Sequence, residues 1–270
     1  MIEEMSSQEK KFIKGNISEV IQVGNIVCRD IKPQSESIHR LLLHLENKGI
    51  QFTPRFLGLN ENNQEMMSFV EGETIEDYPQ INDIDKKVMA VQIAAKMLRE
   101  YHDATLDFKR YPNDIWFLDY EGKLQTEVIC HNDFAPYNVT FIGNLPIGVI
   151  DFDTACPAPR IWDVAYAVYR FVPLGMKVYN PVTKNYRRYD KTLDCSERRL
   201  LLSTFLDTYG ISDASEVLEN VIMRLQALVK LFDEECHKGN AAFVKMKEEG
   251  HQQLYINEIV FITENKYEWI

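Results

Sequence analysis

Apolar and polar residues alternate in two different rhythms along this chain. In the first 70 residues the apolar positions come as short, β-branched runs that flank turn signals such as Gly24-Asn25, a pattern typical of β-hairpins. From residue 83 onward they recur every three or four positions, and a long amphipathic helix is predicted over residues 83–104. The two rhythms predict an α+β chain with a small β-rich N-terminal lobe, residues 1–70, and a larger, mostly helical lobe, residues 71–270.

Other segments follow the same two rhythms. Strands are predicted over residues 56–59 and 65–70, and helices over residues 35–48, 196–209 and 213–237, with a last helical stretch that reaches residue 262. Residues 173–194 break the periodicity. We expect a long loop there, either a lid over a substrate pocket or a plain surface segment.

The candidate catalytic and metal-binding residues lie in the middle of the chain. His131 and Asp133 form a His-x-Asp motif, Asn138 follows five residues after the Asp, and Asp151 comes directly after an apolar run. The pattern over residues 139–150 predicts a β-hairpin. Because a hairpin returns the chain to its start, we expect Asn138 and Asp151 to lie beside each other.

These residue types suit phosphoryl transfer. That reaction depends on positioning and charge neutralisation, so it needs a carboxylate at the attacking hydroxyl and oxygen ligands for Mg²⁺. Asp133 fits the first role, and Asn138 and Asp151 fit the second. Asp153 is either a further metal ligand or a solvated loop carboxylate, and His131 is expected to brace the loop.

The order and spacing of these motifs resemble the catalytic core of the aminoglycoside phosphotransferase and choline kinase-like family, the small-molecule relatives of protein kinases. The resemblance implies a protein-kinase-like two-lobe fold that uses ATP or GTP. It also implies Asp133 as the catalytic base and Asn138 and Asp151 as metal ligands. Asp163 matches a later family Asp that braces the catalytic loop, although the helix dipole also favours a carboxylate in the first turn of a helix.

The first hairpin places a cation on the face where this family binds nucleotide. Pairing Val23 with Ile26 puts Val20 opposite Arg29, and side-chain alternation then puts Val20, Val27 and Arg29 on the same face. In the kinases that the chain resembles, two small apolar residues on this face cover the adenine and a Lys reaches the phosphates. Arg29 takes the place of that Lys here, and Arg is a permanently charged, bidentate phosphate ligand.

Two further observations concern the role of Arg29. Lys32 is a second candidate for the phosphates, but its strand parity is opposite to that of Arg29. The helix that follows presents Ile38 and His39 where kinases usually present a Glu to the strand Lys. We therefore expect that ion pair to be absent.

Two further segments are expected to bind the nucleotide. The loop that contains Gly15 and Ser18 occupies the place of a kinase glycine-rich loop, although it is poor in Gly. The backbone of Ser68, Phe69 and Val70 is expected to meet the purine as the hinge between the lobes. The alternative for these three residues is a plain edge strand.

Composition narrows the function. The chain has 270 residues and is 45% hydrophobic, which is enough for two lobes with their own cores. Its net charge of −11 argues against non-specific nucleic-acid binding, which needs a basic footprint, and is compatible with a cationic substrate. Five scattered cysteines suggest reduced thiols, and neither a leader nor an apolar run of about 18 residues is visible, so we expect a cytoplasmic protein that does not contact membranes.

The leading hypothesis is a phosphotransferase that moves the γ-phosphoryl group of ATP or GTP, with Mg²⁺, to a hydroxyl of a small molecule. Aminoglycoside-like, amino alcohol and sugar acceptors all fit, and no pattern in the sequence indicates an oligomeric state. The alternative is a nucleotide-binding pseudokinase with a regulatory role, motivated by Arg29, the missing helix Glu and the Gly-poor loop. A phosphohydrolase using Asp151 and Asp153 is weaker, because a His-rich or two-metal carboxylate cluster is lacking.

Overall fold

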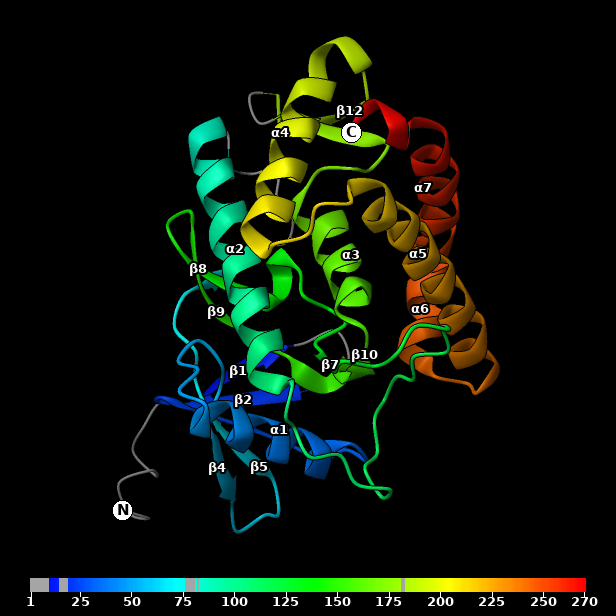
Figure 1. Ribbon diagram of the computed structural model, residues 1–270. Helices are drawn as coiled ribbons and strands as arrows, with labels where there is room; N and C mark the ends of the chain where they lie inside the picture. The colour runs from blue at the N-terminus through cyan, green and yellow to red at the C-terminus, as the bar shows by residue number, and fades with distance from the viewer. Residues whose placement is uncertain (1–9, 15–18, 76–80, 82, 181–182) are drawn as a thin grey trace.

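The computed structural model of the chain describes residues 10–14, 19–75, 81, 83–180 and 183–270. Figure 1 shows a small sheet with one helix at the bottom and a larger helical part above it. The predicted α+β architecture, with a small β-rich part followed by a mostly helical one, is confirmed. We call the two parts the small lobe and the large lobe; the boundary between residues 70 and 71 stays a prediction.

The small lobe is an antiparallel sheet in the strand order β1-β2-β3-β5-β4. Val23 pairs with Ile26 around Gly24-Asn25, as the sequence predicts, and Gly24 has a positive φ of 58° that suits a tight turn. The strands are β1 (Lys10–Lys14), β2 (Glu19–Val23), β3 (Ile26–Arg29), β4 (Phe56–Leu59) and β5 (Glu65–Ser68).

One helix, α1 (Ser35–Asn47), completes the small lobe and confirms the helix predicted there. Its buried stripe consists of Ile38, Leu41, Leu42 and Leu45, each at most 1% exposed. The spacing of these residues puts them on one helix face, so burying them fixes which way the rest of α1 points.

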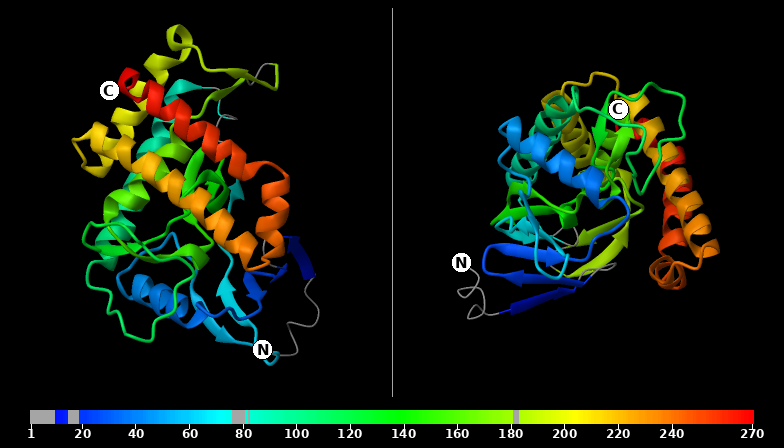
Figure 2. Two further views of the ribbon diagram at one scale, coloured as in Figure 1. Left: turned by 90° about the vertical axis from the view of Figure 1, so that its right-hand side faces the viewer. Right: turned by 90° about the horizontal axis from the view of Figure 1, so that it is seen from below.

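The large lobe is built around long helices whose apolar faces meet. Asp83 caps the first of them by accepting hydrogen bonds from the backbone N–H groups of Asp85 and Lys86. Figure 2 shows α5 and α7 running along each other on one side of the lobe. The helices are α2 (Ile84–Thr105), α3 (Arg160–Phe171), α4 (Lys191–Tyr209), α5 (Ala214–His237), α6 (Ala241–Glu248) and α7 (His251–Asn265). Among the described residues, none of the helices is both long and apolar enough to span a membrane.

Two short sheets carry the middle of the chain. The predicted hairpin is present as β8 (Val139–Ile142) and β9 (Leu145–Val149), and β6 (Glu73–Thr74) pairs with β8 on its other side. Its turn consists of Gly143 and Asn144. Pro146 lies inside β9, which is an edge strand and therefore tolerates a residue that cannot donate. The second sheet pairs β7 (Val128–Cys130) with β10 (Cys156–Ala158).

The expected long loop over residues 173–194 is wrong. This segment contains a hairpin, β11 (Lys177–Asn180) with β12 (Asn185–Arg188), held in part by a tilted ring contact between Tyr179 and Tyr186 at 5.2 Å. It lies at the end of the large lobe that is farthest from the small lobe (Figure 1), and the choice between a lid over a substrate pocket and a plain surface segment stays a prediction. Helix α4 also starts five residues earlier than predicted, after its cap Asp190.

Candidate active site

The loop after β7 is anchored by one buried carboxylate. Asp163, in the first turn of α3, accepts hydrogen bonds from the backbone N–H groups of His131 at 2.6 Å and of Asn132 at 2.9 Å. Asn132 has a positive φ of 64°, a conformation that Asn tolerates better than most residues. Asp163 thus holds the bend that leads into Asp133, which is the geometry expected of a brace.

His102 supports Asp163 from α2 and was not identified from the sequence. Its Nε2 lies 3.0 Å from Asp163 and its Nδ1 lies 2.6 Å from the hydroxyl of Tyr209, and both members of the His–Asp pair are fully buried. Burial lowers the pKa of His102 in spite of the neighbouring carboxylate. Burial works in the opposite direction on Asp163, but the hydrogen bond from His102 and the nearby charges lower its pKa. His102 is therefore neutral and donates a hydrogen bond to the ionised carboxylate of Asp163.

His131 joins the loop to the strand that precedes Asp151. Its Nε2 donates to the carbonyl oxygen of Ile150 at 3.0 Å, and its Nδ1 accepts from the backbone N–H of Asp133 at 3.3 Å. Because a carbonyl can only accept, these contacts fix the tautomer with the proton on Nε2. His131 thus couples the positions of Asp133 and Asp151 without facing a substrate.

The carboxylate of Asp133 is held at both oxygens. The hydroxyl of Tyr137 donates to Oδ1 at 2.5 Å, and the amide Nδ2 of Asn138 donates to Oδ2 at 2.8 Å and to the backbone oxygen of Asp133 at 3.0 Å. Tyr137 also meets the hydroxyl of Tyr166, on α3, at 2.8 Å. Each oxygen keeps a lone pair for a further donor, so Asp133 is oriented and still able to accept a proton.

The hairpin brings Asn138 beside Asp151, as the sequence predicts. The backbone N–H of Ile150 donates to the carbonyl oxygen of Asn138 at 2.8 Å, and Asp151 follows with a positive φ of 61°. The side chain of Asp151 is exposed, although neighbouring groups crowd its carboxylate. Partial desolvation and then the like charge of Asp153 raise its pKa. A cation between these oxygens would relieve that repulsion.

Asp153 links the large lobe to two cations of the small lobe. Arg29 donates to both oxygens of Asp153, at 3.0 and 2.6 Å, and Nζ of Lys32 donates to Oδ2 at 2.5 Å. In this arrangement Asp153 acts as a shared counter-ion for the two candidate phosphate ligands. The sequence offered either a metal ligand or a solvated carboxylate for Asp153 and did not foresee this third role.

Arg29 also has a carboxylate partner within its own sheet. As expected, α1 supplies no Glu, but Glu65 lies directly opposite Arg29 in the β3–β5 ladder and binds its Nε. His39 of α1 holds the other oxygen of Glu65 at 2.5 Å. Burial opposes ionisation of Glu65, but the bond from His39 and the charge of Arg29 lower its pKa to about 2. The carboxylate therefore reaches the cation from a neighbouring strand.

Comparison with known proteins identifies the family. A model of the phosphotransferase enzyme family matches residues 116–194, the segment that contains Asp133, Asn138, Asp151 and Asp163. The trifolitoxin immunity protein of Rhizobium leguminosarum bv. trifolii is 31% identical over 204 residues, which cover 73% of this chain and 72% of that protein. The chain belongs to the phosphotransferase enzyme family.

Solved structures confirm the kinase-like fold of this phosphotransferase. The gentamicin complex of the aminoglycoside phosphotransferase APH(2")-IIa aligns with a TM-score of 0.59 at 16% identity, over 96% of this chain and 93% of that one. A choline/ethanolamine kinase family protein from Mesorhizobium loti aligns with a TM-score of 0.55 at 11% identity, over 95% and 92%. With its family membership, the fold makes the chain a phosphotransferase of the small-molecule kinase type.

The residues predicted to contact the nucleotide differ in how accessible they are in the structure. Val20 and Val27 are half-buried in the small sheet. The N–H groups of Ser68 and Phe69 donate to backbone oxygens of their own lobe, while the backbone of Val70 makes no hydrogen bond to another described residue. Of the predicted hinge, Val70 thus has both its backbone N–H and its carbonyl open to a base. The remaining two predictions, Gly15 and Ser18, lie outside the described residues.

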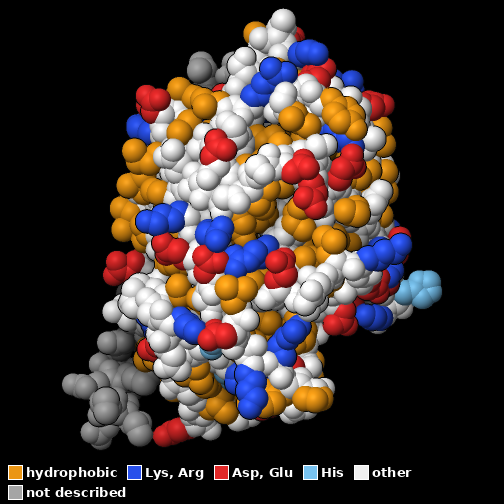
Figure 3. All heavy atoms as spheres, in the orientation of Figure 1, with side chains coloured by type: hydrophobic (Ala, Val, Ile, Leu, Met, Phe, Trp, Pro, Cys, Tyr) orange, Lys and Arg blue, Asp and Glu red, His pale blue; other side chains and the backbone are white. Residues whose placement is uncertain are grey.

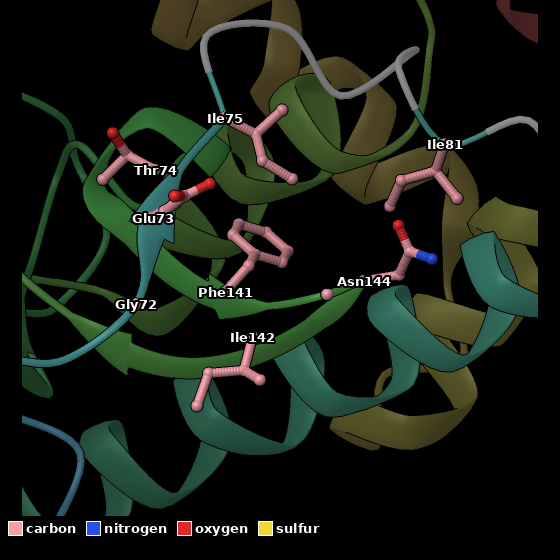
Figure 4. Close-up of a pocket in the computed structure, with 9 residues that line it drawn as sticks. Gly72, Glu73, Thr74, Ile75, Ile81, Phe141, Ile142 and Asn144 are labelled. Carbon is pink, nitrogen blue, oxygen red and sulfur yellow. The ribbon is translucent and has the colours of Figure 1, made fainter.

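A hollow of about 580 Å³ lies on the outer side of the β6–β8–β9 sheet, and no predicted site residue lines it. Figure 4 shows the side chains of Phe141, Ile75 and Ile81 around it, with Asn144 at the hairpin turn. It is therefore separate from the site formed by Asp133.

Proposed function

We propose that this protein transfers the γ-phosphoryl group of ATP or GTP to a hydroxyl group of a small molecule in the presence of Mg²⁺. The observation that carries the proposal is the arrangement of Asp133, Asn138 and Asp151, in which one carboxylate is oriented by neighbouring donors and two further oxygen-bearing side chains adjoin it. A structural loop has no need for this combination of residues.

In this proposal Asp133 orients the acceptor hydroxyl and accepts its proton. Tyr137 and Asn138 hold the carboxylate in a fixed rotamer, so the hydroxyl meets it without reorganisation. His131, Asn132 and the buried Asp163 keep the loop in place at longer range.

The side chains of Asn138 and Asp151 fit a magnesium ion. Asn138 gives both amide hydrogens to Asp133, which leaves its Oδ1 as the ligand atom. Partial desolvation and then the like charge of Asp153 raise the pKa of Asp151, and a bound cation would offset both effects. When bound, Mg²⁺ would neutralise charge that develops on the phosphate oxygens. Arg29 and Lys32 are the residues proposed to hold the phosphates, and Val20, Val27 and Val70 the base.

The pseudokinase alternative loses one of its arguments. It relied partly on the missing Glu of the helix after the first hairpin, but Glu65 supplies the equivalent charge to Arg29 from β5. The second weak alternative, a phosphohydrolase, would need Asp153 at a second metal, and Asp153 instead faces Arg29 and Lys32.

The test is an acceptor screen with ATP or GTP and Mg²⁺, read as nucleotide-dependent product mass. The panel holds aminoglycosides, amino alcohols, sugars and hydroxy acids, and, because a related protein confers immunity to trifolitoxin, hydroxyl-bearing toxins as well. We expect a product that is 80 Da heavier than its acceptor, a mass fixed by the added HPO₃ group. Asp133→Ala should lower turnover by about 10²–10⁴-fold while nucleotide still binds, and the matched exposed variant Asp119→Ala should not. Turnover by Asp133→Ala close to that of wild type would contradict the assignment.

A further inference from the structure

A second cation, Arg170, lies near Asp133 in the large lobe. It occupies the last turn of α3, a helix that runs away from the small lobe in Figure 1. Its guanidinium carbon is 5.0 Å from the ring centre of Tyr137, whose hydroxyl donates to Asp133. Arg170 is therefore only one aromatic side chain away from the proposed base.

Arg170 has no carboxylate partner among the described residues. It lies 5.7 Å from the ring centre of Tyr169, its Nε is buried without a hydrogen bond, and only part of its surface reaches solvent. The more deeply buried Arg198 and Arg224 also lack a carboxylate partner in the described part of the chain, but their guanidinium groups donate to backbone oxygens. Arg29 binds two carboxylates. A buried guanidinium that faces only ring systems and hydroxyls is incompletely compensated.

The acidic groups around Arg170 do not neutralise it by contact. Asp133 is held by Tyr137 and Asn138, and Glu258 of α7 accepts a hydrogen bond from the backbone N–H of Met176 at 2.9 Å. Burial raises the pKa of Glu258 even though basic side chains, including Arg170, attract its charge. Neither carboxylate forms an ion pair with Arg170.

The carboxylates that would suit a cationic acceptor are also engaged. Asp233, Glu234 and Glu235 lie in one run on α5, and each has a lysine partner: Lys247 at 2.8 Å, Lys230 at 3.3 Å and Lys238 at 2.8 Å. Figure 3 likewise shows basic and acidic side chains intermingled over that face of the molecule. The negative net charge of the chain therefore does not translate into a free acidic pocket at this run.

We propose that Arg170 is a carboxylate-binding subsite for the acceptor, so that the acceptor is a small molecule that carries both a hydroxyl and a carboxylate. The inference rests on the proposed function and narrows it. In-line transfer places the acceptor across from the nucleotide, and Arg170 lies at the end of α3 that points away from the small lobe. A planar guanidinium pairs bidentately with a carboxylate, which would fix the acceptor while its hydroxyl meets Asp133.

The experiment compares acceptors that differ only in charge. Glycerate is paired with glycerol and N-acetyl-L-serine with N-acetyl-L-serinamide, with ethanolamine and kanamycin as cationic acceptors, and kcat/KM is measured for each. We expect the carboxylate member of each pair to be preferred by on the order of 10–100-fold, the range of a charge-assisted hydrogen bond. Arg170→Gln should bring that ratio close to one by raising KM for the carboxylate, and Arg170→Lys should restore part of it. The exposed Arg110→Gln is the matched control and should keep the wild-type ratio.

Binding is measured separately so that the two proposals can fail separately. N-acetyl-L-serine is titrated by NMR into protein loaded with ADP and Mg²⁺. Arg170→Gln is expected to weaken its binding by on the order of 10–100-fold, the same range as for the preference in kcat/KM. Equal binding to wild type and variant overturns the carboxylate subsite, as does equal or better use of the neutral or cationic acceptors. A uniform loss of kcat for all acceptors in Arg170→Gln also overturns it, because Arg170 would then act on the transferred phosphoryl group. If no acceptor of any charge gives product while charge-selective binding is present, the proposed function fails and the subsite stands.

Discussion

Asn138 donates both hydrogens of its amide to Asp133, one to the backbone oxygen at 3.0 Å and one to the carboxylate at 2.8 Å. These bonds settle which atom of the amide faces the neighbouring Asp151, since only Oδ1 is left. The proposed base and the proposed metal ligand are thus parts of one hydrogen-bonded unit.

The first prediction concerns the metal. Asn138→Ala and Asp151→Asn should each weaken the binding of ADP at least about tenfold in Mg²⁺ and much less in EDTA, because the first removes an oxygen ligand and the second removes the negative charge of one. Calorimetric titration under both conditions measures the difference, and the exposed Asn113→Ala serves as control. Equal losses with and without Mg²⁺ would show that these side chains contact the nucleotide or the fold and not the ion.

The second prediction concerns Arg29. Arg29→Ala should weaken triphosphate binding by on the order of 10–100-fold and nucleoside binding far less, and Arg29→Lys should recover only part of the loss, because Lys lacks the planar fork. The same variant leaves Glu65 buried without its cation, so the free energy of unfolding should fall by roughly 3–5 kcal/mol. A loss of stability with an unchanged ratio of triphosphate to nucleoside affinity would assign Arg29 a structural role only and move the phosphates to Lys32.

The third prediction separates the roles offered for Asp153. If Asp153 is a counter-ion that occupies Arg29 and Lys32 until phosphates arrive, Asp153→Asn should strengthen the binding of metal-free ATP several-fold, since it removes a competing anion. If Asp153 is a metal ligand, the same change should weaken binding of the magnesium complex and leave the metal-free nucleotide unaffected. We expect the first outcome, and fluorescence titration with and without Mg²⁺ distinguishes the two.

The fourth prediction is a pH dependence of stability at Glu65. Its folded pKa of about 2 lies below the ordinary 4.5, so its contribution is fully present above pH 4.5 and is lost as the pH falls toward 2. The difference in pKa corresponds to roughly 3 kcal/mol. The free energies of unfolding of wild type and Glu65→Gln are measured in urea at about pH 7, 4.5 and 3. The difference between the two proteins should become smaller only at the lowest pH. Glu121→Gln, whose partner Lys230 is on the surface, should change stability by less than about 1 kcal/mol throughout.

The sequence predicted those elements and site residues whose position is determined by nearby residues. The apolar stripe of α1, the cap at Asp83 and the Gly24-Asn25 turn are each encoded within a few residues, and the elements they predict are present. The motif from His131 to Asp151 is equally local, because a hairpin connects its two ends.

The features that the sequence did not predict depend on contacts between distant segments or on strands without an apolar pattern. Glu65 is opposite Arg29 because β5 pairs with β3 across 36 residues, and nothing near either residue specifies that pairing. Arg170 lies beside Tyr137 because of how α3 packs on the catalytic loop, which the period of the helix alone does not determine. The β11–β12 hairpin escaped notice because its strands are short and largely polar, so they lack the apolar alternation that marks a strand.

The position of Glu65 has a consequence for control. A carboxylate supplied by α1 would meet Arg29 only in one placement of that helix, and shifting the helix would work as a switch. Glu65 instead faces Arg29 in the same β-ladder, so the pair forms whenever the sheet forms. Helix α1 reaches Glu65 through His39, on the oxygen that Arg29 does not use, and through the side chain of Ser35. The ion pair of Arg29 and Glu65 is thus built into the sheet of the small lobe and does not need a carboxylate delivered by a moving helix.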